Sequence, residues 1–222
     1  MTPKARGQHA PAPRLAGTGQ LADDLYLIAH HERTGKPLLA PRAVGLGLAG
    51  ALLAELIMAG AIGIAVGTVA AGPFRSNDAL AAGVIGQVTA EPQRYPVQDW
   101  LTVLARTVPQ QVAGRLAEAG YLVPASGRPW RGQRWVPVDA DCAFAPVTRI
   151  CSAIGSARGD AQGVTLAALA AACGLGARLA LYLPPGSRAR LDQAAAWLDP
   201  SLREVITQTQ AAVDAAVLAH RA

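Results

Sequence analysis

The sequence is short of charged residues, of aromatic residues and of lysine. Charged residues make up 16% of the 222 positions, against about 25% in an average soluble domain. Aromatic residues make up 5%, although 51% of the chain is hydrophobic, so alanine, leucine, valine and isoleucine supply most of the apolar surface. This composition excludes a disordered chain and favours packed helices over a strand-rich fold, in which aromatic side chains are enriched.

The basic residues are almost all arginine. Lys4 and Lys36 are the two lysines among 20 basic residues, and with 15 acidic residues the formal net charge is +5. Arginine presents a rigid fork of donors that matches phosphate geometry. The bias is therefore compatible with recognition of phosphate groups or of an anionic membrane surface.

The three cysteines predict neither a disulfide framework nor a zinc site. Cys142, Cys151 and Cys173 are odd in number and show no CxxC or CxxH spacing, so we expect a reducing, cytoplasmic setting. Residues 1–20 contain basic residues but no apolar run after them, which predicts a flexible tail and not a signal peptide. We expect this tail to precede one domain over residues 21–222.

The usual catalytic signatures are missing from the sequence. It has no GxGxxG after a predicted strand, no GxxxxGKS/T loop, no HExxH and no GxSxG. His30 and His31 are interpreted as part of a solvated turn, because neighbouring residues on a helix point about 100° apart and cannot chelate one metal ion together. Asp23 and Asp24 are interpreted as acidic residues in the first turn of a helix. We predict no enzyme, no metal ion and no cofactor.

One apolar segment has to be considered as a membrane span. Val44–Ala71 contains a single charge, Glu55, and a span needs about 20 apolar residues. A carboxylate in the middle of a bilayer costs about 2.5 kcal/mol or more, and the apolar residues after Gly60 alternate as they do in a strand. We predict a buried helix over about Gly45–Ala59, a stop at Gly60 and a short strand pair. A transmembrane helix is the alternative.

Apolar residues at helical spacing predict that most of the remaining chain is helical. The expected helical segments are residues 21–30, a helix from an N-cap at Asn77 to Glu91, an amphipathic pattern over residues 95–116, and segments around residues 147–154, 165–183, 187–198 and from Asp199 onward. The predicted fold class is therefore a single, mainly α domain.

Residues 121–139 differ in kind from the rest of the chain. Two short apolar strands, Tyr121–Val123 and Trp135–Val138, flank a connection rich in glycine, proline and arginine, which predicts a protruding β-hairpin. Tryptophans and arginines are interleaved in it: Arg128, Trp130, Arg131, Arg134 and Trp135.

This mixture at an exposed turn points to a membrane surface. Tryptophan prefers the headgroup level of a bilayer, and arginine pairs with lipid phosphates. Two alternatives stay open: the tryptophans fold back onto the core, or they stack on single-stranded nucleic acid. The second is disfavoured because no extended basic groove pattern accompanies the hairpin.

Four segments, in this order, resemble the Golgi phosphoprotein 3 family, including its bacterial members. They are LADDLYLIA from Leu21, GLAGALLAELIMAGAI from Gly47, QDWL from Gln98 and RLAEAGYLV from Arg115. The most specific element is Gly50–Leu56 followed by a Gly-x-Ile step. The resemblance runs from about residue 20 to the C-terminus and so covers most of the chain.

The resemblance implies a helical core wrapped by amphipathic helices, with one β-hairpin that dips into a membrane. It also implies a peripheral membrane adaptor, because eukaryotic members recognise phosphatidylinositol 4-phosphate and bind glycosyltransferase tails and coat components. The family's lipid site uses one tryptophan and three arginines. Arg106 stands at one of the arginine positions, whereas Ala40 stands at the tryptophan position and Ala49 and Pro109 at the other two.

Both lines of reasoning meet at the hairpin. We therefore expect a cytoplasmic, peripheral membrane adaptor that binds anionic phospholipid through Arg106, Arg128, Trp130, Arg131, Arg134 and Trp135. A headgroup like that of phosphatidylinositol 4-phosphate is the more specific hypothesis, and protein tails or coat-like proteins are further expected partners, whereas nucleic acid is not. The alternative is a soluble helical scaffold that binds proteins and no lipid.

Overall fold

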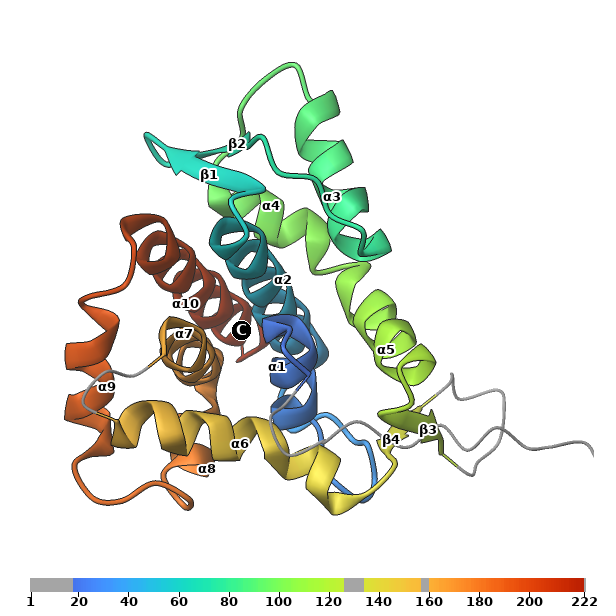
Figure 1. Cartoon of the computed structure of the whole chain (residues 1–222), viewed down its shortest axis with the longest axis vertical. Helices are drawn as coiled ribbons and strands as arrows, with labels where there is room; N and C mark the ends of the chain where they lie inside the picture. Colours follow the sequence, from blue (N-terminus) through green and yellow to red (C-terminus); the bar gives the residue numbers. More distant parts are fainter. Residues whose placement is uncertain (1–17, 126–133, 157–159, 222) are drawn as a thin grey trace, which may run out of the picture.

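The computed structural model of the chain describes residues 18–125, 134–156 and 160–221 (Figure 1). In chain order its elements are α1 (Leu21–Ala29), α2 (Pro41–Met58), β1 (Ile62–Ala65), β2 (Thr68–Ala71), α3 (Ala79–Ala90), α4 (Val97–Leu104), α5 (Val108–Glu118), β3 (Leu122–Pro124), β4 (Trp135–Pro137), α6 (Ala140–Gly155), α7 (Ala161–Ala170), the π-helical turn η3 (Ala171–Leu175), α8 (Gly176–Leu179), α9 (Ser187–Ala195) and α10 (Pro200–Arg221). The predicted class is confirmed, because helices dominate and the strands form two small antiparallel pairs.

α2 is the central helix, and most of it is buried because its sequence is predominantly apolar. It packs against α1, α4, α5, α7 and α10 (Figure 1). Two glycines permit this close packing: a Cβ atom at Gly50 would collide with Thr209 of α10, and one at Gly47 would collide with the sulfur of Cys173. The helix begins four residues before the predicted start and ends one residue before the predicted end, with Ala59 as its C-cap.

Two helical stretches are long and apolar enough to cross a membrane, Pro41–Met58 and Ala161–Leu179. However, 72% of the first and 67% of the second lie buried in the fold, as core helices do. The charge in the first stretch is also accommodated by the protein, since Glu55 Oε1 accepts a hydrogen bond from the Ala22 N–H at 2.6 Å. The structure therefore supports the predicted buried helix over the transmembrane alternative.

The strand pair predicted after Gly60 is confirmed. Gly60 follows α2 with a φ of +70°, the left-handed conformation that glycine commonly supplies just after a helix. β1 and β2 then pair antiparallel, from Ile62 opposite Ala71 to Ala65 opposite Thr68. Val66 and Gly67 form the turn with φ values of +53° and +72°. Valine rarely adopts this conformation, and the Val66 side chain is fully exposed.

α3 begins one residue later than predicted, because Asp78 and not Asn77 is its N-cap. Asp78 Oδ2 accepts a hydrogen bond from the Ala81 N–H at 2.8 Å. The amphipathic pattern over residues 95–116 is divided between α4 and α5, with a turn at residues 105–107 between them. The apolar residues of both helices face the core as predicted: Val97, Trp100, Leu101, Leu104, Val108, Val112 and Leu116.

The second hairpin is confirmed in its described part. Leu122 pairs with Pro137 and Pro124 pairs with Trp135. Two backbone hydrogen bonds extend the ladder beyond the strands, from the Ala125 N–H to the carbonyl of residue 134 and from the residue 138 N–H to the carbonyl of residue 121, at 2.8 and 3.0 Å.

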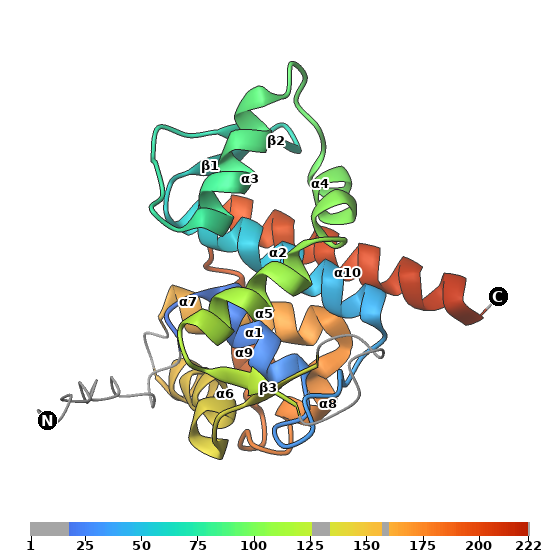
Figure 2. The same cartoon turned by 90° about the vertical axis from the view of Figure 1, so that its right-hand side faces the viewer.

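The C-terminal half departs from prediction at one point. The segment 165–183 is not one helix: α7 passes through η3 into α8, because Gly174 has a φ of +91° and interrupts the helical geometry. Asp199 caps α10 as predicted, accepting a hydrogen bond from the Ser201 N–H at 2.8 Å. Figure 2 shows the start of α2 and the end of α10 together at the right of the molecule.

Candidate functional site

Five of the six predicted site residues belong to the second hairpin, and the structure describes two of them. Arg128, Trp130 and Arg131 lie outside the described residues. Arg134 is exposed immediately before β4, whereas Trp135 is half-buried and packs against the hydrophobic core. Of these two neighbours, Arg134 is therefore open to a partner and Trp135 contributes to packing of the hairpin.

The base of the hairpin rests on the loop that joins α1 to α2. A Cβ atom at Gly35 would collide with the carbonyl group of Trp135, so the two segments are in close contact. The loop is closed on itself by a bridge between His30 and Pro37. Because α2 begins four residues after this bridge, the loop connects the base of the hairpin to the start of the central helix.

Arg106, the sixth predicted residue, lies in the turn between α4 and α5 and lines a hollow of about 280 Å³. Arg42 and Leu46 of α2 and Thr102 and Ala105 at the end of α4 complete the lining. Neither guanidinium group forms an ion pair with any residue in the described ranges. Two arginines from distant segments therefore share one hollow.

The N-terminus of α2 adds positive potential at the same place. The first helical hydrogen bond runs from the Val44 N–H to the Ala40 carbonyl, so the N–H groups of Arg42 and Ala43 have no partner within the helix. Ala40 is the N-cap and has no side chain that could accept from them. The aligned peptide dipoles of this 18-residue helix make its start positive. An anion bound in the hollow would lower the electrostatic energy of this arrangement.

Arg42 was missed in the sequence analysis, although the sequence holds a signal for it. It is the one basic residue in α2, and it stands at the second position of the helix. A cation at the positive end of a helix is electrostatically unfavourable, so this placement needs a reason. Its proximity to Arg106 depends on tertiary packing and could not be predicted from spacing.

Asp23 and Asp24 lie in the first turn of α1, as predicted, but they also make long-range ion pairs that the sequence did not indicate. Both are buried. Asp23 Oδ1 lies 2.7 Å from Nη2 of Arg115, and Asp24 Oδ2 lies 3.1 Å from Nη1 of Arg149. These partners are 92 and 125 residues away in the chain, so no local pattern could reveal them.

Arg115 also lies close to two further carboxylates. Its Nη1 lies 3.1 Å from Asp78 Oδ2, and its Nη2 lies 3.7 Å from Glu55 Oε1. Burial raises the pKa of Glu55 to about 8 and that of Asp23 to about 6, although Arg115 lowers both. The cluster connects α1, α2 and the N-cap of α3 to α5. It therefore fixes α5, and with it the turn that carries Arg106, relative to α2.

His30 is not part of a solvated turn, contrary to the interpretation from sequence. Its ring stacks on Tyr26, with centroids 4.0 Å apart, and its Nδ1 lies 2.7 Å from the Tyr26 carbonyl oxygen. Burial lowers the pKa of His30, which favours a neutral ring. Within the described part of the chain, no three His, Cys, Asp or Glu side chains come together as metal ligands.

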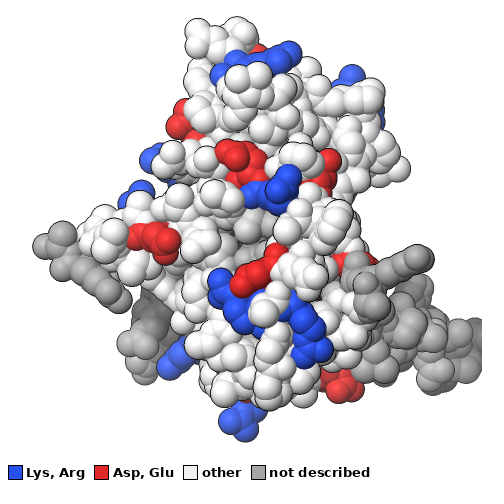
Figure 3. All heavy atoms as spheres, turned by 90° about the vertical axis from the view of Figure 1, so that its left-hand side faces the viewer, with Lys and Arg blue, Asp and Glu red and all other residues white. Residues whose placement is uncertain are grey.

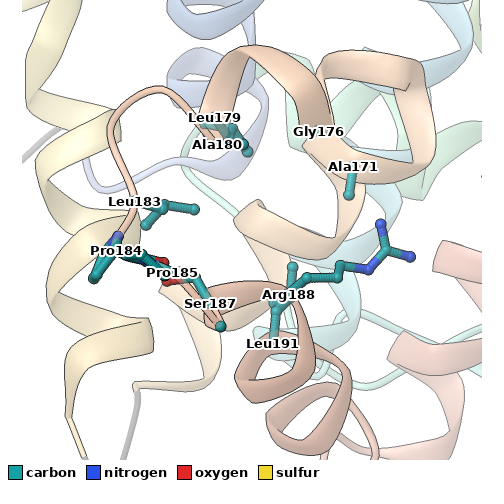
Figure 4. A pocket seen from close by; sticks show the side chains of 11 residues that line it. Ala171, Gly176, Leu179, Ala180, Leu183, Pro184, Pro185, Ser187, Arg188 and Leu191 are labelled. Carbon is teal, nitrogen blue, oxygen red and sulfur yellow. The ribbon is translucent and has the colours of Figure 1, made fainter.

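A larger hollow of about 440 Å³ lies between α8 and α9 (Figure 4). Its lining is mostly apolar, including Leu179, Leu183 and Leu191, with Arg188 as its charged residue. Arg188 Nε donates to both carboxylate oxygens of Asp192, at 3.0 and 3.2 Å. This hollow therefore offers apolar surface but a cation that is already paired.

Charges of both signs are interspersed on the side of the molecule opposite to the view of Figure 2. On the described atoms of that side, basic and acidic side chains alternate without forming a broad field of one sign (Figure 3). Arg42 and Arg106 differ from this pattern, because the lining of the hollow that they share contains no acidic residue among those the structure describes.

Fold and site together define a mainly helical domain in which two arginines line one hollow at the start of a buried central helix. Residues 21–209 match the family described as Golgi phosphoprotein 3 (GPP34), and the chain therefore belongs to the Golgi phosphoprotein 3 family. The match confirms the resemblance seen in the sequence. This family is not a known enzyme family, and it is a family of Golgi-associated peripheral proteins. No curated protein gives a significant match to the sequence.

Proposed function

We propose that this protein binds anionic phospholipid at the cytoplasmic surface of a membrane and acts there as a peripheral adaptor. The hollow shared by Arg42 and Arg106 carries the proposal. Two guanidinium groups without a protein carboxylate can pair with the oxygens of one phosphate group. The free N–H groups at the start of α2 supply two more donors for the same anion.

Two exposed apolar residues are sequence neighbours of residues that line hollows with these arginines. Val103 follows Thr102 in α4 and is 56% exposed, and Leu218 near the end of α10 is 66% exposed. The end of α10 lies beside the start of α2 (Figure 2). Cations next to exposed apolar groups suit the boundary between lipid headgroups and acyl chains, so this part of the surface is the proposed membrane contact.

The second hairpin extends the proposed contact. Arg134 is exposed, and the connection before it contributes, by sequence, Arg128, Arg131 and the interfacial residue Trp130. Trp135, packed on the core, holds the base of the hairpin. Each arginine at an anionic surface contributes about 1 kcal/mol. Arg134, Arg42 and Arg106 together would therefore raise the partitioning of the protein onto an anionic membrane about 150-fold.

Sedimentation with vesicles tests the proposal. At low salt, we expect the protein to bind phosphatidylcholine vesicles that contain phosphatidylserine and not to bind vesicles of pure phosphatidylcholine. Added salt should release the protein from the vesicles, because it screens the charges. Replacing both Arg42 and Arg106 with alanine should weaken binding about 30-fold. Arg188→Ala serves as the matched control, because it removes one exposed arginine that is paired with Asp192. The proposal is contradicted if the wild-type protein does not bind acidic vesicles at low salt, or if the double variant binds them like the wild type.

The finer hypothesis is selection of a phosphoinositide headgroup like that of phosphatidylinositol 4-phosphate. A phosphate monoester carries more charge than the diester of phosphatidylserine and exposes more oxygens, so the two arginines and two N–H groups can bind it in more ways. We expect tighter binding to phosphoinositide vesicles than to phosphatidylserine vesicles of equal total charge. Equal binding at equal charge would reject this selectivity and leave general anionic binding in place. Trp130→Ala, which spares the packing of Trp135, tests the hairpin separately.

A protein-binding scaffold without lipid affinity is the second candidate. It is favoured by the apolar hollow between α8 and α9 (Figure 4) and by the strongly exposed Leu181 and Trp197 near that helix pair. Exposed apolar patches on a surface commonly mark partner sites. Failure of the vesicle experiment, together with capture of protein tails that Trp197→Ser abolishes, would favour this candidate.

A further inference from the structure

A second hollow shares Arg42 with the proposed phosphate site. It has a volume of about 560 Å³ and is lined by residues at the start of α2 and the end of α10. Figure 2 shows the positions of these two helix ends. Apart from Arg42, its lining is apolar: Ala40, Pro41, Ala43, Ala216, Val217 and Ala219. Its volume falls within the range of about 300–1,000 Å³ that is typical of small-molecule sites.

Small side chains on both helices create this space. Four of the seven lining residues are alanine, and they come from α2 or its N-cap and from the last turns of α10. Larger apolar residues at these positions would fill the hollow. Arg42 therefore lines two hollows. It shares the polar one with Arg106, and the other one is apolar.

We infer that the apolar hollow receives the first part of an acyl chain of the anionic lipid whose phosphate Arg42 and Arg106 bind. The inference rests on the proposed lipid function and goes beyond surface attraction, because it makes the acyl chain part of the ligand. Continuity through Arg42 identifies the occupant: a phospholipid carries its phosphate and its alkyl chain a few bonds apart, which matches a polar and an apolar hollow that share one residue.

Water-soluble probes allow a test without a bilayer. Glycerol 3-phosphate represents the headgroup alone, and dibutanoyl, dihexanoyl and dioctanoyl phosphatidic acid, each kept below its micelle concentration, add alkyl length. Binding is measured by titration calorimetry on the full chain. We expect the affinity to rise about fourfold for each methylene that enters the hollow and to reach a plateau when the hollow is full.

Variants locate the effect. Ala219→Trp should fill the hollow and lower the affinity for the dihexanoyl lipid at least tenfold, while glycerol 3-phosphate binding stays unchanged. Ala211→Trp is the matched control, because Ala211 is an exposed alanine of the same helix outside the lining. Arg106→Ala should weaken lipid and glycerol 3-phosphate alike.

The outcomes separate the two proposals. If neither glycerol 3-phosphate nor any of the lipids binds, the result contradicts the phosphate site and therefore the proposed function. Equal affinity for all chain lengths, or an Ala219→Trp protein that binds lipid like the wild type, overturns the acyl-chain inference and leaves the phosphate site standing. A change of oligomeric state in Ala219→Trp without a change in lipid affinity assigns the hollow to a second copy of the chain and overturns the inference as well. The chain-length series on the wild type decides the question even if the variant does not fold.

Discussion

Replacing Glu55 with glutamine tests the buried ionic cluster most directly, because it removes an ionisable group and keeps a hydrogen-bond acceptor. Glu55 Oε1 accepts a hydrogen bond from the Ala22 N–H, and the amide oxygen of glutamine can accept the same bond. The two side chains are also nearly equal in size. Glu55→Gln therefore separates the effect of ionisation from the effect of packing.

The size of the effect follows from the pKa of Glu55, which burial raises from 4.5 to about 8. The folded state then holds this proton more strongly than the unfolded chain does. The stabilisation is complete below pH 4.5 and is lost as the pH rises through about 8. At about 1.4 kcal/mol for each pKa unit, this titration lowers the free energy of unfolding by up to about 5 kcal/mol. Glutamine does not titrate, so the variant avoids this loss.

Urea unfolding followed by circular dichroism at pH 5, 7 and 9 measures the effect. We expect Glu55→Gln to lie within about 1 kcal/mol of the wild type at pH 5 and to exceed it by several kcal/mol at pH 9. Glu91→Gln, which removes the same formal charge from an exposed position, is the control for the loss of a carboxylate outside the buried cluster. Parallel profiles of Glu55→Gln and wild type over this range would refute the reasoning, because they would mean that Glu55 ionises in the fold without cost.

Three further predictions concern stability. Arg115→Met should lower the free energy of unfolding at pH 7 by about 3–5 kcal/mol, because it leaves buried carboxylates unpaired. Part of the loss should return at pH 5, and an unchanged melting temperature would contradict the ionic cluster. Gly50→Ala should lower stability by about 1–3 kcal/mol through its collision with Thr209, whereas Gly114→Ala, with open space around it, should raise it by about 0.5–1 kcal/mol; equal urea midpoints would contradict the close packing of α2 on α10. Val66→Asn should raise stability by about 1 kcal/mol, because asparagine tolerates the positive φ of this turn, and a lower melting temperature would contradict the turn geometry.

The parts of the fold that sequence predicted well are those that local chemistry determines. The end of α2 and the strand pair were predicted from Gly60 and from the alternation that follows it, because both signals act within a few residues. The position of the second hairpin was predicted from its turn-rich connection for the same reason. The N-cap of α3 was misplaced by one residue, since Asn77 and Asp78 are both good caps and packing decides between them.

The candidate site could be predicted only in part. Arg106 was found through the family resemblance, whereas Arg42 was missed because its proximity to Arg106 depends on how α4 packs on α2. The same limit explains Asp23 and Asp24, whose partners lie far away in the chain. Pairs of this kind form only when the helices assemble, so residue spacing does not encode them.

The buried acids also change how the sparse charge of this protein should be counted. The formal net charge of +5 treats Glu55 as ionised, but its pKa of about 8 leaves it protonated at pH 7, which makes the net charge +6. Asp23 and Asp78 both contact Arg115, and Asp24 contacts Arg149. These carboxylates are at least as numerous as their arginine partners, so the surplus of positive charge lies with the remaining residues, among which Arg42, Arg106 and Arg134 have no acidic partner in the described ranges. A protein with few charges can thus attract an anionic surface, because several of its carboxylates are paired or neutral in the interior.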